Sequence, residues 1–309
     1  MKANKPEANL HRLPTEQPNQ AAADLDLKSS LDLARLINSE DARVAAAVEH
    51  ALPQIARAIN LIAAGLRRGG RLIYVGAGTS GRLAALDAAE CPPTFNTDPQ
   101  TVQYVIAGGP RALGLPIEAS EDSARLGSQE MAKKRPGAND VVVGIAASGR
   151  TPFTVAALRY ARQQGAMTVA VACNQNSPLE RAADVAIVTA VGPEVLSGST
   201  RMKAGTAQKM VLNMLSTGAM TRLGYVYGNL MVNLHVKNEK LLQRAISILH
   251  RASGISRPKA QQALKAAGNS VPVALVMLKA GVTPGEAQRA LKLAGGHVRK
   301  AVALASSAS

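Results

Sequence analysis

Two hydroxyl-rich loops have the composition and position needed to bind a phosphate group. Gly76-Ala-Gly-Thr-Ser-Gly81 directly follows an apolar run and opens a helical stretch, and Ala147-Ser-Gly-Arg-Thr151 repeats this arrangement. Backbone N–H groups at a helix N-terminus and neighbouring hydroxyls can together cradle a phosphate monoester. One such loop would be only a capped turn, but two on neighbouring strand ends can converge on one ligand. The predicted phosphate ligands here are Thr79, Ser80, Ser148, Arg150 and Thr151.

A third polar cluster, Gly192-Pro-Glu194 followed by Ser197-Gly-Ser-Thr-Arg-Met-Lys203, precedes a long helical stretch. Its two cationic side chains could balance phosphate charge. We therefore add Glu194, Ser199, Thr200, Arg201 and Lys203 to the predicted site. An alternative stays open, in which Ser199 and Thr200 cap the helix and Lys203 is an exposed base.

The first loop also satisfies the G-x-G-x-x-G pattern of dinucleotide-binding proteins, which by itself is a weak signal. Such proteins place an acidic residue at the end of the next strand to bind the ribose. Here that strand ends Val105-Ile-Ala-Gly-Gly109 and has no carboxylate. This argues against a nicotinamide cofactor.

Five short apolar runs, separated mostly by helical stretches, predict the elements that carry these loops. The runs are 71–75, 102–107, 140–146, 166–173 and 184–190, and two helices, 25–38 and 42–66, precede them. Gly69-Gly70 is expected to end the second of these helices. Alternation of strand and helix predicts an α/β fold with a parallel sheet and right-handed crossovers. Functional loops should then lie at the carboxyl ends of the strands.

Residues 1–24 are polar and are predicted to form an N-terminal arm without the apolar core of a signal peptide. Residues 25–235 form the predicted α/β domain, and residues 236–309 a helical C-terminal subdomain. That subdomain contains a repeat, because 260–268 and 287–295 match at a spacing of 27 residues. Each copy predicts an amphipathic helix with a glycine stop, similar to the helices of ubiquitin-associated modules.

The net charge of +15 is concentrated in this last region, where twelve Lys or Arg face only Glu239 and Glu286. A nucleic-acid-binding tail is one interpretation, but we prefer a solvated basic face and expect no nucleic-acid partner. No apolar run is long enough to predict a membrane span. Two cysteines without paired spacing favour a reducing, cytoplasmic location.

Several longer blocks resemble the N-acetylmuramic acid 6-phosphate etherases, a family built on the sugar-isomerase (SIS) domain. They are 76–82, 86–95, 144–153 and 192–203, and the Glu-Cys-Pro-Pro-Thr-Phe segment at 90–95 is the most specific. Leu13-Pro-Thr-Glu16 and Asn229-Leu-Met-Val232 also resemble family segments. The resemblance implies a three-layer SIS fold, a sugar-phosphate substrate and a homodimer with shared sites.

The resemblance also implies that Glu90 is a proton donor and that Glu121 is the second active-site acid, assigned here as the base. Pro92 and Pro93 are expected to end the helix at Glu90, and Asp122 is expected to cap the next one. The reaction that the resemblance implies is cleavage of the D-lactyl ether by β-elimination, and an elimination that uses two carboxyl groups needs no metal or redox cofactor. In agreement with this, the five histidines show no metal-binding spacing. The alternatives are a sugar-phosphate-sensing transcription regulator and a non-catalytic binding module resembling glucokinase regulatory protein.

Overall fold

The computed structural model describes residues 12–234, 236 and 238–307. The first eleven residues of the predicted arm, and His235 at the predicted domain boundary, lie outside this range. Contacts divide the chain into two compact units, one formed by 1–88 and 102–215 and the other by 89–101 and 216–309. Two long helices, α4 (Gly78–Phe95) and α8 (Lys203–Leu223), each contribute residues to both units. The predicted boundaries after residues 24 and 235 stay predictions.

The first unit is built on a five-stranded parallel sheet in the order β2-β1-β3-β4-β5. The predicted fold class is therefore confirmed. The strands are β1 (Leu72–Gly76), β2 (Val102–Ile106), β3 (Val141–Ile145), β4 (Met167–Ala172) and β5 (Val185–Val188). Buried residues dominate β1 to β4 because helices cover both faces of the sheet, and they alternate with partly buried residues in β5.

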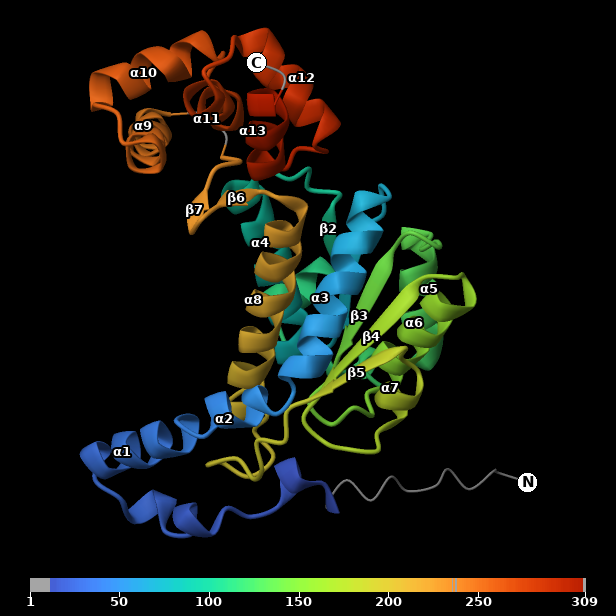
Figure 1. Ribbon diagram of the computed structural model, residues 1–309. Helices are drawn as coiled ribbons and strands as arrows, with labels where there is room; N and C mark the ends of the chain where they lie inside the picture. The colour runs from blue at the N-terminus through green and yellow to red at the C-terminus, as the bar shows by residue number, and fades with distance from the viewer. Residues whose placement is uncertain (1–11, 235, 237, 308–309) are drawn as a thin grey trace. The chain divides into compact units, whose positions relative to one another are not determined.

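Helices lie on both faces of this sheet (Figure 1). On one face α3 (Leu52–Arg67) contacts β1, β3 and β5. On the other, α6 (Pro152–Gln163) contacts β1, β3 and β4, with α5 (Ala124–Lys134) beside it and α7 (Pro178–Arg181) next to β4 and β5. Side chains such as Ile62, Tyr74 and Leu158 fill the two interfaces and are fully buried.

The helices before the sheet differ from the prediction. The expected helix over 42–66 is in fact two, α2 (Val44–Glu49) and α3, and α1 (Ser30–Asp41) precedes them. Pro53 explains the break, because proline lacks an N–H for the preceding turn and is tolerated only in the first turn of a new helix. The predicted glycine stop is confirmed, since Gly69 follows α3 with φ of +79°.

The prediction that Pro92 and Pro93 end the helix at Glu90 is wrong. Helix α4 continues through both prolines to Phe95. Its last turn is held by Asn96, which has φ of +53° and donates its backbone N–H to the Pro92 carbonyl at 2.9 Å. This left-handed cap stabilises the final turn, so Glu90 lies within a continuous helix.

The second unit contains the end of α4 and mostly helical chain after residue 215. Its helices are α9 (Glu239–Ser253), α10 (Arg257–Ala266), α11 (Val271–Ala280), α12 (Pro284–Leu293) and α13 (Val298–Ser307). The sequence repeat forms α10 and α12, and each is followed by a positive-φ glycine, Gly268 or Gly295. This unit also contains a short antiparallel pair of strands, β6 (Val226–Tyr227) and β7 (Leu230–Met231), which the sequence pattern did not predict.

Candidate active site

The order of the strands marks one edge of the sheet as the place for a ligand. From β1 the chain crosses to β2 on one side and then to β3 on the other, so the loops after β1 and β3 diverge. Gly76 of β1 lies opposite Ile145 of β3, which brings the two hydroxyl-rich loops to neighbouring strand ends. Ligands of open α/β sheets bind in the crevice at this switch point.

The glycines of the first loop are required by close backbone contacts. A Cβ on Gly81 would lie 2.5 Å from Ile106 Cγ1, and one on Gly76 would lie 2.9 Å from the Gly81 nitrogen. Gly78 has φ of +51°, a conformation that side chains disfavour. The loop therefore turns tightly into α4. The first N–H groups of a helix have no partner within the helix and are available to bind an anion.

Ser80 lies in the first turn of α4 and is almost buried, with 8% of its surface exposed. Its hydroxyl donates to Gln208 Oε1 of α8 at 2.9 Å. Thr79 faces the start of the same helix, because its Cγ2 would be 3.5 Å from a Cβ on Gly205. The sequence did not single out Gln208, since its partner lies 128 residues away.

Glu121 lies beside the same loop. Its Oε1 is 3.2 Å from the position of a Cβ on Gly78. Its carbonyl accepts the Phe153 N–H at 3.0 Å, which ties it to the start of α6 just after the second hydroxyl-rich loop. Burial raises the pKa of Glu121, the neighbouring Asp122 and Glu118 raise it further, and Arg82 opposes them. A carboxyl group with a raised pKa is a stronger base once it is ionised.

The expected helix cap next to Glu121 is wrong. Asp122 is exposed and does not cap α5; the cap is Ser123, whose hydroxyl accepts the Leu126 N–H at 3.2 Å. Gly78 also matters to the site, besides the hydroxyl residues, because any side chain at this position would approach the Glu121 carboxylate.

The second loop is tightly folded on itself. Ser148 Oγ accepts a hydrogen bond from the Arg150 N–H at 3.1 Å. Gly149 has φ of +65°, and a Cβ at this position would lie only 2.3 Å from Ser177 Oγ. Thr151 precedes α6 and its hydroxyl makes no capping bond. Arg150 lines a groove of about 420 Å³ with residues of α5, α6 and α7, among them Arg159 and Pro178.

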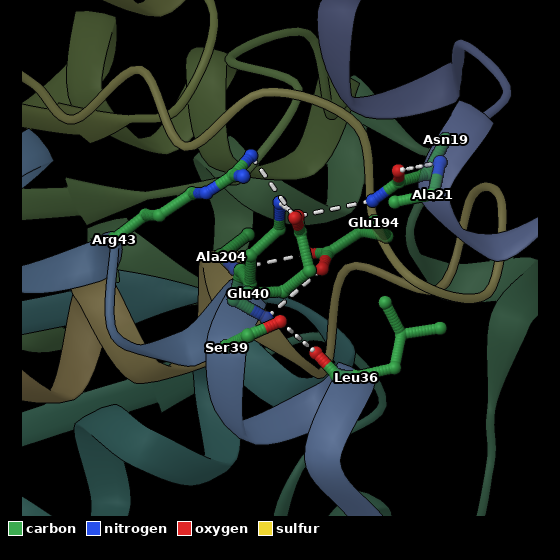
Figure 2. Close-up of polar contacts among 9 residues, drawn as sticks. Asn19, Ala21, Leu36, Ser39, Glu40, Arg43, Glu194 and Ala204 are labelled. Carbon is green, nitrogen blue, oxygen red and sulfur yellow. Dashed lines mark hydrogen bonds and ion pairs between the residues drawn. The ribbon is translucent and has the colours of Figure 1, made fainter. Parts of the chain in front are cut away.

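Glu194 lies in a buried polar cluster with Glu40 and Ala204 (Figure 2). Lys203, at the start of α8, contacts both carboxylates of this cluster. The Glu194 carboxylate is fully buried and accepts the backbone N–H groups of Lys203 and Ala204, each at 2.9 Å. Burial raises the pKa of Glu194, and those two bonds offset part of the rise. The helix is therefore capped by Glu194, and neither Ser199 nor Thr200 is needed for that role.

The Lys203 ammonium is 3% exposed and lies 2.5 Å from Glu40 Oε2. The same carboxylate accepts Asn19 Nδ2 at 3.0 Å and pairs with Arg43 at 3.0 Å (Figure 2). Burial favours a higher pKa for Glu40, but the hydrogen bond and charge of Lys203, with Asn19 and Arg43, outweigh it and lower the pKa. Lys203 is thus neither the exposed base of the alternative interpretation nor an unpaired cation.

The segment Leu13–Gln17 is built into the first unit. Thr15 is fully buried, and Asn174 Nδ2 donates both to its hydroxyl at 3.0 Å and to the Ala147 carbonyl at 2.9 Å. Ser197 in turn donates to the carbonyl of Glu16 at 3.3 Å. The segment therefore contacts the loops after β4 and β5, and Asn174 connects it to the loop after β3.

The remaining predicted residues lie at or near the surface. Arg201 is exposed, and Ser199 and Thr200 are partly exposed, next to the start of α8. Glu90 is exposed on the part of α4 that belongs to the second unit. The structure thus groups Thr79, Ser80 and Glu121 around one loop, and gives Glu194 and Lys203 buried protein partners.

Curated relatives cover most of this chain. It is 58% identical over 88% of its length to N-acetylmuramic acid 6-phosphate etherase of Symbiobacterium thermophilum, covering 90% of that protein. It is 50% identical over 87% of its length to the enzyme of the same name from Clostridium beijerinckii, covering 89%. The chain belongs to the N-acetylmuramic acid 6-phosphate etherase family.

Family models agree with this assignment at the level of domains. The SIS domain model matches residues 127–218, and the model of the N-terminal SIS domain of glucokinase regulatory protein matches 54–162. A third, described as the C-terminal lid domain of glucokinase regulatory protein, matches 228–268. This chain thus matches two domain models named after that regulatory protein, while the two relatives above, at 50% identity or more over most of its length, carry the etherase name.

Proposed function

We propose that this chain cleaves the D-lactyl ether of N-acetylmuramic acid 6-phosphate, giving N-acetylglucosamine 6-phosphate and D-lactate. Its family membership supplies the reaction class. The observation in the structure that supports it is the placement of Glu121, a carboxyl group of raised pKa, against the Gly78 end of a phosphate-type loop.

The chemistry needs one base and one acid. In the ring-opened sugar, the C1 aldehyde makes the C2 proton acidic. Glu121 removes this proton, the C3–O bond breaks, and Glu90 donates a proton to the departing lactate oxygen. Water then adds to C3 of the unsaturated aldehyde and a proton returns to C2, so the net change is hydrolysis of the ether. Each proton transfer contributes roughly 10²–10⁴-fold to the rate.

The phosphate is held, in this proposal, by the loops after β1 and β3. The N–H groups at the start of α4, with Thr79 and Ser80, form the main cradle, and Ser148 and Thr151 complete it from the neighbouring strand end. Arg150 and Arg201 supply positive charge nearby, and Ser199 and Thr200 supply hydroxyls. Glu194 and Lys203 contribute to the site indirectly, because their contacts fix the position of the start of α8.

The enzyme is further proposed to act as a cytoplasmic homodimer. One SIS copy per chain supports a second copy as the partner. Burial raises the pKa of the Cys173 thiol to about 12, which makes this thiol unreactive. Cys91 is also buried, and neither cysteine is part of a disulfide, as is usual in a compartment where thiols stay reduced. In the described part of the chain no helix is both long and apolar enough to cross a membrane.

The proposal is tested by incubating the purified chain with N-acetylmuramic acid 6-phosphate and measuring D-lactate enzymatically. Lactate release without any added nucleotide or metal, undiminished by EDTA, is expected. Binding of sugar phosphate without lactate release would instead favour the regulator, and a requirement for one metal would contradict the two-carboxylate mechanism.

A further inference from the structure

The buried amide of Gln208 has an incomplete set of hydrogen bonds. Gln208 lies on α8 and is 1% exposed. Its Oε1 accepts the Ser80 hydroxyl, but its Nε2 has no hydrogen-bond partner among the described residues. A buried donor left unpaired is rare and unfavourable, so such a group calls for a physical explanation.

The explanation lies in the position of Ser80 on the candidate phosphate loop. While its proton is used by Gln208, the hydroxyl cannot donate to a phosphate oxygen. If the amide rotates by 180°, Nε2 donates to Ser80 Oγ and the hydroxyl proton is released toward the ligand. The rotation exchanges atoms of nearly equal size, and it leaves an unpaired acceptor, which proteins tolerate better than an unpaired donor.

We infer that Gln208 is a positioning residue for phosphate binding, whose amide turns so that Ser80 donates to the ligand. This inference rests on the proposed function only in taking a sugar phosphate as the ligand. In this structure Ser80 donates to Gln208. In the occupied site Gln208 donates to Ser80, and Ser80 donates to the phosphate.

The hydrogen bond between Ser80 and Gln208 lies wholly within the first unit and joins the starts of two long helices, α4 and α8. Gln208 is in the second turn of α8, whose first turn is capped by Glu194. Gly205, one turn earlier, faces Thr79. The packing that fixes α8 therefore also fixes where the Gln208 amide meets the loop.

The test measures the affinity of the full-length chain for N-acetylglucosamine 6-phosphate by calorimetry, together with thermal unfolding. Ser80→Ala should weaken binding by roughly 10- to 150-fold, the value of one hydrogen bond to a charged group. Gln208→Met, which keeps the volume but removes the amide, should weaken it by roughly 3- to 10-fold without lowering the unfolding temperature. Gln129→Met, an exposed change on α5, is the matched control and should bind as wild type does.

Two further variants separate positioning from simple packing. In Ser80→Ala/Gln208→Met the second change should add nothing, because Gln208 acts only through the Ser80 hydroxyl. In Gln208→Glu the ionised carboxylate can only accept a hydrogen bond from Ser80. The affinity of this variant for the sugar phosphate should therefore fall progressively as pH rises. Additive losses, wild-type affinity in Gln208→Met, or no binding of the sugar phosphate at all would overturn the inference. Binding that follows the expected pattern in a chain that releases no lactate would support it while refuting the proposed activity.

Discussion

Lys203 Nζ lies 2.5 Å from Glu40 Oε2, and each of these side chains is at most 3% exposed. The pair joins α1 to the start of α8, 163 residues further along the chain. Because the Lys203 N–H also bonds to Glu194, one residue connects three segments of the first unit. An ion pair this deeply buried makes the cluster sensitive to the loss of either partner.

Breaking this pair should destabilise the first unit. Glu40→Gln leaves Lys203 as a buried charge without its carboxylate, and we expect a loss of about 3–5 kcal/mol in the free energy of unfolding. Lys203→Met should lower the free energy of unfolding by less, because Asn19 and Arg43 still contact Glu40. The double variant Glu40→Leu/Lys203→Met should recover much of the loss, since no unpaired charge remains. Urea unfolding measures all three, and equal stability of Glu40→Gln and wild type would contradict this view.

The same pair makes stability depend on pH. The pKa of Glu40 is lowered in the folded state from its ordinary value of 4.5. Its stabilisation is therefore complete above pH 4.5 and is lost as pH falls through the lowered value. In Glu40→Gln this contribution disappears, so unfolding free energy should fall less steeply between pH 5 and acid than in wild type.

The raised pKa of Glu121 predicts the acidic limb of the pH–rate profile. A base must be ionised to take the C2 proton, so kcat/KM should rise as pH passes through a pKa above 4.5. Asp122→Asn and Glu118→Gln each remove a negative charge that raises this pKa, and each should move the limb to lower pH. The control Glu130→Gln alters a carboxylate paired with Lys133 and should leave the limb in place. An unmoved limb in both test variants would assign it to another group.

Gly78→Ala should impair both folding and catalysis. Its φ of +51° costs an alanine about 1–2 kcal/mol, and the new Cβ would lie 3.2 Å from Glu121 Oε1. We expect kcat to fall at least tenfold, because a displaced base loses its alignment with the substrate. Gly114→Ala is the control, since its φ is −106° and nothing lies within 4 Å of the new Cβ. Unchanged kcat in Gly78→Ala would place the base elsewhere.

The two carboxylates can be distinguished by isotope exchange. Glu90→Gln removes the proposed acid but leaves the base, so in D₂O the C2 proton should still exchange while lactate release falls by roughly 10²–10⁴-fold. Glu121→Gln should abolish exchange and turnover together. Mass spectrometry and proton NMR of the recovered sugar measure the exchange. The opposite pattern would reverse the two roles, and near-normal turnover in both variants would remove these residues from the mechanism.

The sequence alone determined the layered α/β architecture and the loops of interest. Apolar runs such as 141–145 are local signals, because a strand buried on both faces must be apolar throughout. Glycines such as Gly69 and Gly268 also ended helices as predicted, since positive φ is a property of the single residue. Local signals misjudged α4, where the two prolines indicated a stop but the Asn96 cap supports a further turn.

The tertiary structure decided which polar side chains meet. Ser80 and Gln208 are 128 residues apart, and Glu40 and Lys203 are 163 apart. Nothing in the sequence around any of these residues predicts its partner, and only the folded topology brings the pairs into contact. The buried partner of Lys203 and the unpaired Nε2 of Gln208 therefore left no local trace in the sequence. Burial and hydrogen-bond geometry arise from contacts between distant segments, whereas helix and strand patterns arise from neighbours along the chain.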